Sequence, residues 1–167
     1  MRGVSLIEAK VSSDSRGSFS KILDYEALRT ITKFEVREVF ITTSKVGTLR
    51  GMHLQIKEAE NWRAIHVSKG TVFDVLLDLR KEEPTFKSIQ TNILASDKPR
   101  TLIVPPGVAH GFQALTDAEM LYISSHEYNS SLDTGINPFS IQVDWPIGVS
   151  AISERDLNLK SLSDFEI

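Results

Sequence analysis

The sequence contains no cysteine among its 167 residues. Disulfide bonds, thiolate metal ligands and cysteine nucleophiles are therefore excluded. The formal net charge of -3 gives no basic field for a nucleic acid, although local basic sites for a small anion are compatible with it. No apolar run is long enough for a membrane span or a secretory leader, so we expect a cytoplasmic protein with no membrane partner. Residues 1–167 can bury a core without covalent staples and are expected to form a single domain.

Helical patterns are scarce in the sequence, and short strand patterns dominate. The clearest strand pattern covers residues 72–79, where two sets of side chains alternate between Gly70 and a charged turn that ends at Pro84. Further strands are expected over residues 34–43, 49–55, 63–67, 88–94, 101–104 and 120–126. Short helical turns are expected over residues 25–30 and 153–157, with Ser153 as the cap of the second. Many short strands at this spacing predict an all-β fold, an antiparallel sandwich or barrel.

The most informative segment is the run LRGMHLQ at residues 49–55. Side chains alternate between the two faces of an extended strand, so His53 should share a face with Gly51 and Gln55, and Arg50 should lie on the opposite face. A metal site in a small β-barrel typically has a second histidine two residues after the first, and Gln55 occupies that position. The segment therefore favours proton transfer or anion binding over metal ligation. The structural alternative is a hydrogen-bonded wall histidine beside an unrelated surface arginine.

Six sequence blocks occur in a fixed order between residues 50 and 146. They read RGMHLQ at 50–55, GTVFDV at 70–75, DLR at 78–80, PTF at 84–86, PPGVAHGF at 105–112 and DWP at 144–146. These blocks resemble the signature motifs of the dTDP-4-dehydrorhamnose 3,5-epimerase family, within a longer match that runs from about Asp14 to Asp156. The resemblance implies a cupin-like antiparallel β-barrel or jelly roll with a few short helical turns, no metal, no other cofactor and usually a homodimer. The implied activity is epimerisation beside the keto group of a nucleotide-linked 4-keto-6-deoxy sugar.

Inversion of a carbon next to a ketone requires a base on one face, an acid on the other and a cation or donor near the carbonyl oxygen. His53 has a suitable intrinsic pKa for the base, and the resemblance implies that Asp156 orients it. Tyr122 matches the family's catalytic tyrosine, which reprotonates the opposite face. Without the resemblance, Asp156 reads as an ordinary first-turn helix aspartate and Tyr122 as a core tyrosine. The histidines at positions 66 and 126 match no catalytic position.

The resemblance also assigns residues to substrate binding, namely Arg16, Phe19, Arg50, Gln55 and His110. Arg50 would hold the diphosphate, for which its planar donor fork is suited. His110, in the loop-to-strand block at residues 105–112, would line the pocket, or would otherwise bond the backbone of its own turn. Arg16 and Phe19 belong to an N-terminal segment that the resemblance expects to cross to a partner subunit. We therefore expect a homodimer.

Three departures from the family pattern bear on the substrate. Arg63 stands where the family has an active-site lysine, so the positive charge is kept but its shape and hydration change. Lys21 stands where the family has a glutamate that helps to bind the thymine base. Residues 38–41 read EVFI where many relatives place polar glutamine and asparagine. The sequence thus predicts a working epimerase on a different nucleotide or sugar, with the nucleotide, the hexose or heptose skeleton and the choice of C3 or C5 left open.

Three functions remain to be weighed. The first is an isomerase that inverts C3, C5 or both beside a 4-keto group, in deoxysugar or surface-polysaccharide biosynthesis. The second is a nucleotide-sugar ketoisomerase, whose family carries different motifs around the first histidine. The third is a sugar-nucleotide-binding cupin whose catalysis is impaired, with Arg63 as the symptom. Retention of His53, Asp156 and Tyr122 together favours the first.

Overall fold

The computed structural model describes residues 1–32 and 34–165. Its strands are β1 (Ser5–Glu8), β2 (Lys10–Asp14), β3 (Gly17–Lys21), β4 (Glu38–Ser44), β5 (Leu49–Gln55), β6 (Arg63–Lys69), β7 (Thr71–Asp78), β8 (Ile89–Ala95), β9 (Arg100–Val104), β10 (Val108–Ala114), β11 (Ala118–Ser124) and β12 (Asp133–Gly135). The helices are α1 (Tyr25–Ile31), the 3-10 turn η1 (Lys57–Ala59) and α2 (Glu154–Leu157). None of these described helices has the length and apolar character needed to cross a bilayer.

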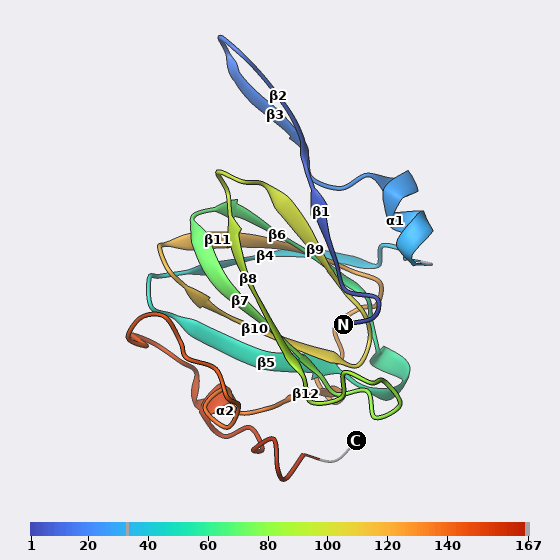
Figure 1. The fold of residues 1–167 in the computed structure, drawn as a ribbon, viewed down its shortest axis with the longest axis vertical. Coiled ribbons are helices and arrows are strands. Elements are labelled where there is room, and N and C mark those ends of the chain that lie inside the picture. The colour runs from blue at the N-terminus through green and yellow to red at the C-terminus, as the bar shows by residue number, and fades with distance from the viewer. Residues whose placement is uncertain (33, 166–167) are drawn as a thin grey trace.

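Antiparallel strands form two facing five-stranded sheets. The strand order is β1-β9-β6-β11-β4 in the first sheet and β12-β5-β10-β7-β8 in the second. Strands β2 and β3 form a separate hairpin, which projects away from both sheets in Figure 1. This architecture confirms the prediction of an all-β, cupin-like antiparallel jelly roll with little helix.

The main core lies between the two sheets. Ile65 of β6 and Leu102 of β9 come from the first sheet and pack with Val72 and Leu76 of β7 from the second, all four without measurable solvent exposure. Alternation along β7 places Asp74 on the same inner face as Val72 and Leu76. A carboxylate is therefore built into the wall of this core, next to the space between the sheets.

Both outer faces of the sandwich are also covered. Phe34 and Leu28 pack with Ala64 and Ile103 on the outer side of the first sheet, where α1 lies. Residues 136–145 and the chain beyond them pack against the outer side of the second sheet. Every residue of β10 is buried as a result. The strands that carry the cavity described below are thus fixed from both sides.

The strand and helix predictions agree with the structure except at a few places. The strand expected from residue 34 begins only at Glu38, because Phe34 packs into the α1 cluster instead. The sequence patterns gave no indication of β1, β2, β3 or β12. The prediction that Ser153 caps the last helix is confirmed, since its hydroxyl accepts a hydrogen bond from the Asp156 backbone N–H at 3.0 Å.

Candidate active site

A cavity of about 800 Å³ lies between the sheets. Strands β4, β5, β6, β10, β11 and β12 contribute to its lining, together with the segment around α2. The sequence-predicted site residues that line it are Arg50, His53, Gln55, Arg63, His110, Tyr122 and Asp156. Arg16 and Phe19 are not among its lining residues.

An irregularity in β5 brings both Arg50 and His53 to the cavity. His110 of β10 lies opposite His53, and Phe112 lies opposite Arg50. Two steps along β10 thus match three steps along β5, so β5 contains one extra residue at this point, as in a β-bulge. The expectation that Arg50 and His53 lie on opposite faces was wrong, because it assumed unbroken alternation along the strand.

Gly51 lies at the irregular position of β5, where a side chain would not fit. Its φ of 122° lies in a region that favours glycine, and an added Cβ would be 2.4 Å from the Cα of Gly111. The two glycines therefore allow β5 and β10 to approach closely. The Gly51 backbone N–H also donates to Asp156 Oδ2 at 3.1 Å, so the same residue helps to hold the site.

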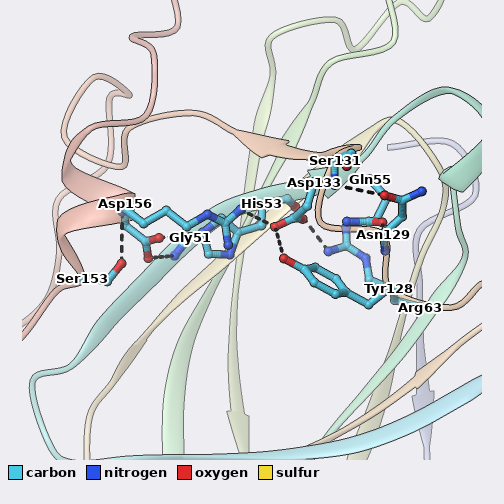
Figure 2. Close-up of polar contacts among 11 residues, drawn as sticks. Gly51, His53, Gln55, Arg63, Tyr128, Asn129, Ser131, Asp133, Ser153 and Asp156 are labelled. Atoms are coloured by element: carbon cyan, nitrogen blue, oxygen red, sulfur yellow. Dashed lines mark hydrogen bonds and ion pairs between the residues drawn. The ribbon is translucent and has the colours of Figure 1, made fainter.

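His53 and Asp156 form a hydrogen-bonded pair at the cavity wall, as Figure 2 shows. The distance from His53 Nε2 to Asp156 Oδ1 is 2.8 Å, and Asp156 is only 3% exposed. Burial tends to raise the pKa of Asp156, but the hydrogen bonds from His53, Gly51 and Ser153 outweigh it and hold the pKa below its usual value. A carboxylate that accepts from Nε2–H leaves Nδ1 of the neutral imidazole free to take up a proton.

Tyr122 lies across the cavity from His53, because β11 belongs to the first sheet and β5 to the second. The tyrosine is 7% exposed, and its ring contacts His110 edge to face at 6.0 Å. Burial, reinforced by the charge of Asp74, raises the pKa of Tyr122 well above its usual value. The phenol therefore stays protonated, and a ligand between the sheets has a base on one wall and a proton donor on the other.

Arg63 is a half-buried cation between β5 and β10. Its Nη1 donates to the carbonyl of His53 at 3.2 Å and its Nη2 to the carbonyl of Val108 at 2.7 Å. Burial lowers the pKa of Arg63, although a guanidinium remains protonated at any physiological pH. Its Nε is buried and has no partner among the described residues. The side chain thus brings positive charge to the cavity while it ties two strands together.

A second carboxylate–imidazole pair was missed by the sequence analysis. His110 Nε2 lies 2.6 Å from Asp74 Oδ2, and Asp74 has no solvent exposure. His110 therefore forms a hydrogen bond with a side chain rather than with the backbone of its own turn. It also lines the cavity. The alternating pattern of residues 72–79 could have revealed this pair, because Asp74 is a charged residue on the face that also carries Val72 and Leu76.

A group of three further side chains at the cavity was also missed, and no local pattern marks it. Asp133 accepts a hydrogen bond from the Tyr128 hydroxyl at 3.3 Å, as Figure 2 shows. Asp133 also forms an ion pair with Arg155. Arg155 precedes Asp156 on α2, so this ion pair joins β12 to the helix that carries the His53 partner. Only the fold brings these segments together.

Gln55 lies on the cavity side of β5, as predicted. Its Oε1 accepts a hydrogen bond from the Asn129 backbone N–H at 2.9 Å, which fixes the amide. The amide nitrogen is buried and has no partner among the described residues. Gln55 thus offers the cavity a donor in place of a metal-binding imidazole. Within residues 1–32 and 34–165, no three His, Asp or Glu side chains gather as a metal-ligand set.

The N-terminal hairpin holds its predicted binding residues away from this cavity. Arg16 pairs with Asp14 at 2.6 Å near the turn of the hairpin, and the Phe19 residue is 65% exposed. Lys21 ends β3 and is exposed. The chain's own fold therefore does not bring Arg16, Phe19 and Lys21 to the histidine and tyrosine.

Known proteins resemble the chain over nearly its whole length. The family model described as dTDP-4-dehydrorhamnose 3,5-epimerase matches residues 1–164. The enzyme of that name from Shigella flexneri is 34% identical over 167 residues, which cover 96% of this chain and 92% of the relative. The enzyme from Methanothermobacter thermautotrophicus is 35% identical, with 97% of this chain and 91% of the relative covered.

Solved structures show the same likeness. The Sulfolobus tokodaii dTDP-4-dehydrorhamnose 3,5-epimerase superposes with a TM-score of 0.94 at 35% identity, covering 100% of this chain and 94% of that one. ChmJ, a 3'-monoepimerase from Streptomyces bikiniensis in complex with dTDP-quinovose, superposes with a TM-score of 0.90 at 25% identity, covering 96% and 84%. With a cavity of this geometry and a family match along nearly its whole length, the chain belongs to the dTDP-4-dehydrorhamnose 3,5-epimerase family.

Proposed function

We propose that this protein is an isomerase that inverts C3, C5 or both carbons of a nucleotide-diphospho-4-keto-6-deoxy sugar. The observation that carries the proposal is the placement of the His53–Asp156 pair and Tyr122 on opposite walls of one cavity. Removal of a proton on one face and its return on the other is the chemistry of epimerisation. No metal or other cofactor is required for it.

The proton balance of the reaction follows from these positions. His53 removes the proton from the carbon beside the ketone, and the C–H electron pair moves into the C–C bond while the carbonyl π pair moves onto the C4 oxygen. Asp156 stabilises the imidazolium that forms. Tyr122 then gives its proton to the opposite face of the carbon as the ketone is restored. Proton exchange with the solvent afterwards returns His53 to the neutral base and Tyr122 to the phenol. Arg63 supplies positive charge for the enolate stage.

Substrate binding is proposed to use the cationic rim of the cavity. Arg50 is exposed, and its guanidinium is oriented by hydrogen bonds to Ser44 Oγ at 3.1 Å and to the carbonyl of Thr43 at 3.2 Å. A guanidinium held in this way suits the oxygens of a diphosphate. His110 and Gln55 contribute to the pocket that surrounds the sugar. The product would enter deoxysugar or surface-polysaccharide biosynthesis.

A second copy of the chain is proposed as the partner. The β2–β3 hairpin is exposed at every residue and carries Val11 and Phe19 at 49% and 65% exposure. A projecting hairpin with apolar side chains is costly in a monomer, and a homodimer would cover it. The arm would also deliver Arg16 and Phe19 to the partner's cavity.

The test is solvent deuterium exchange at C3 and C5, followed by NMR, with thymidine, cytidine and guanosine diphospho-4-keto-6-deoxy sugars. Epimerisation requires incorporation of deuterium together with inversion. Transfer of a proton from one carbon to its neighbour would instead identify a ketoisomerase. Binding of the sugars without any exchange would identify an impaired sugar-nucleotide-binding protein and would overturn the proposal.

A further inference from the structure

Phe40 lies directly beside Tyr122 at the open edge of the first sheet. Strand β4 is the last strand of that sheet, and Phe40 is opposite Tyr122 in the β4–β11 ladder. The two rings stack with their centroids 4.9 Å apart and their planes within 3° of parallel. Phe40 also lines the cavity, and its neighbours Val39 and Ile41 do not. The apolar residue that departs from the family's polar pattern thus contacts the proposed acid.

Within residues 1–32 and 34–165, the Tyr122 hydroxyl is held by a weak hydrogen bond to Met120 and by the nearby Thr42 hydroxyl of β4, whose hydrogen bonding opposes the rise that burial causes in the pKa of Tyr122. The Tyr122 hydroxyl donates to Met120 Sδ at 3.8 Å, and a thioether is a weak acceptor. Ring packing therefore adds to these polar contacts in setting the position of the hydroxyl. Phe40 covers one face of the ring, and the edge-to-face contact with His110 adds a second constraint. Stacked aromatic pairs of this kind contribute beyond the area they bury.

Phe40 also separates Tyr122 from water at the sheet edge. The Phe40 residue is 41% exposed, whereas Tyr122 is 7% exposed, so the Phe40 ring takes most of the solvent contact at this edge. Three charged groups affect the pKa of Tyr122, namely Asp74 of β7, Arg63 of β6 and Arg50 of β5. A fourth ionisable group, His110 of β10, contacts its ring. These groups lie on the other strands of the cavity. Strand β4 contributes Phe40 as apolar cover, together with Thr42, whose hydroxyl acts on Tyr122, and Glu38, which also lines the cavity.

We propose that Phe40 is a positioning residue for Tyr122, which it holds in the orientation needed for proton donation and shields from solvent. The proposal rests on the role of Tyr122 in the proposed function. A displacement of about 1 Å at a reacting group can cost roughly a hundredfold in rate. Loss of the Phe40 ring should therefore impair the return of the proton more than its removal by His53.

Two kinetic signals separate this role from general destabilisation. In Phe40→Ala, inversion should fall about tenfold to a hundredfold while KM changes little. Deuterium exchange without inversion should rise relative to inversion, because His53 still removes the proton. Phe40→Tyr, which keeps the flat ring, should restore inversion, and Phe40→Leu, which keeps only apolar bulk, should lie between. Phe139→Ala, which removes a 53% exposed ring outside the cavity, is the matched control.

A substrate-free measurement distinguishes failure of this proposal from failure of the proposed function. With tyrosine isotopically labelled at Cζ, NMR follows ionisation of Tyr122, whose signal is assigned from Tyr122→Phe. Tyr122 should ionise at lower pH in Phe40→Ala and Phe40→Leu than in the parent; if Phe40→Ala does not fold, Phe40→Leu decides. Unchanged ionisation and an unchanged ratio of exchange to inversion would overturn the positioning role. Full inversion by Tyr122→Phe would instead overturn Tyr122 as the acid.

Discussion

Asp156 and His53 are 103 positions apart in the sequence, yet a 2.8 Å hydrogen bond joins them. Helix α2, which carries Asp156, has only four residues and cannot be stable alone. It is held on the second sheet by contacts outside the helix, including a hydrogen bond of 2.7 Å from Asn137 Nδ2 to the carbonyl of Leu157. Orientation of the proposed base therefore depends on the docking of the C-terminal segment.

The first prediction concerns this pair. His53→Ala should lower deuterium exchange into the substrate by about two to four orders of magnitude, because the base is lost, while substrate binding survives. Asp156→Asn should lower exchange less, because the histidine remains but its tautomer is no longer fixed by a carboxylate. His126→Ala, which changes a histidine outside the cavity, is the control. Exchange at the parent rate in His53→Ala would contradict the mechanism.

Much of the fold was predictable because most strands are amphipathic or continuously apolar. Strands β5 to β11 lie within a few residues of their predicted positions or, for β10, of its loop-to-strand block. The hairpin of β2 and β3 could not be found in this way, because all its residues are exposed and no buried face imposes alternation. Strand β12 has three residues, too few to give a pattern.

The site was predictable only in part, for similar physical reasons. Local pattern identified His53, whereas Asp156 and Tyr122 were identified through the family resemblance. The ion pair of Asp133 with Arg155 joins segments 22 residues apart whose contact is set by tertiary structure alone. Arg50 was assigned to the wrong face, because a one-residue irregularity in a strand leaves no periodic signal.

Metal removal gives a second prediction. Exhaustive treatment with a chelator should leave the exchange rate unchanged, because the chain lacks cysteine, His53 is paired with Asp156, and Gln55 stands where a second histidine ligand would be. The measurement is exchange by NMR before and after treatment, with metal content determined in parallel. A tightly held stoichiometric metal whose loss abolishes exchange would contradict the prediction.

The N-terminal hairpin gives a third prediction. Deleting residues 1–20 should damage both nucleotide binding and association, but it also removes β1, whose Leu6 packs on the main core. Phe19→Ser is a sharper change, because the ring is exposed and lies outside the core. It should weaken association in sedimentation experiments and raise KM. Val36→Ser, at another exposed apolar position, is the control. A fully active monomer would rule out the proposed arm exchange.

Substrate choice gives a fourth prediction. Thymidine diphospho-4-keto sugar should not be the best substrate among the thymidine, cytidine and guanosine compounds, because Lys21 cannot accept from the ring imide as a glutamate would. The lost hydrogen bond costs about 1–3 kcal/mol if it is buried. Lys21→Glu should then strengthen thymidine binding by a corresponding factor. Preference of the parent for thymidine would show that Lys21 does not influence the base.

The same prediction extends to the reacting carbon. Deuterium should enter C3 faster than C5, because the forked cation of Arg63 repositions the carbonyl and small displacements can cost about a hundredfold in rate. Arg63→Lys should raise exchange at C5 relative to C3. The ratio at the two carbons is read from one NMR experiment, so enzyme concentration does not affect it. Complete exchange at both carbons in the parent would contradict the expectation.

A fifth prediction links His66 to acid stability. Burial lowers the pKa of His66 below its ordinary value of 6.5, despite the hydrogen bond of its Nδ1 with the carbonyl of Arg100. As the pH falls, the imidazole of His66 therefore takes up a proton in the unfolded chain before it does so in the folded protein. The contribution of His66 to stability is fully present above pH 6.5 and is lost as the pH falls towards the folded-state pKa. As the pH falls below 6.5, the free energy of unfolding measured in urea should decrease less in His66→Gln than in the parent. His126→Gln should behave like the parent.

The extra residue in β5 also constrains how the gene can vary. A one-codon deletion in a surface loop is often tolerated, because the loop can shorten without moving side chains on the sheets. The same deletion at Gly51 would leave Arg50 and His53 two residues apart, on one face of a regularly paired strand, but it would remove the backbone N–H that donates to Asp156. The product would keep both its base and its anion-binding arginine on the cavity face, and Asp156 would lose one of the donors that hold it.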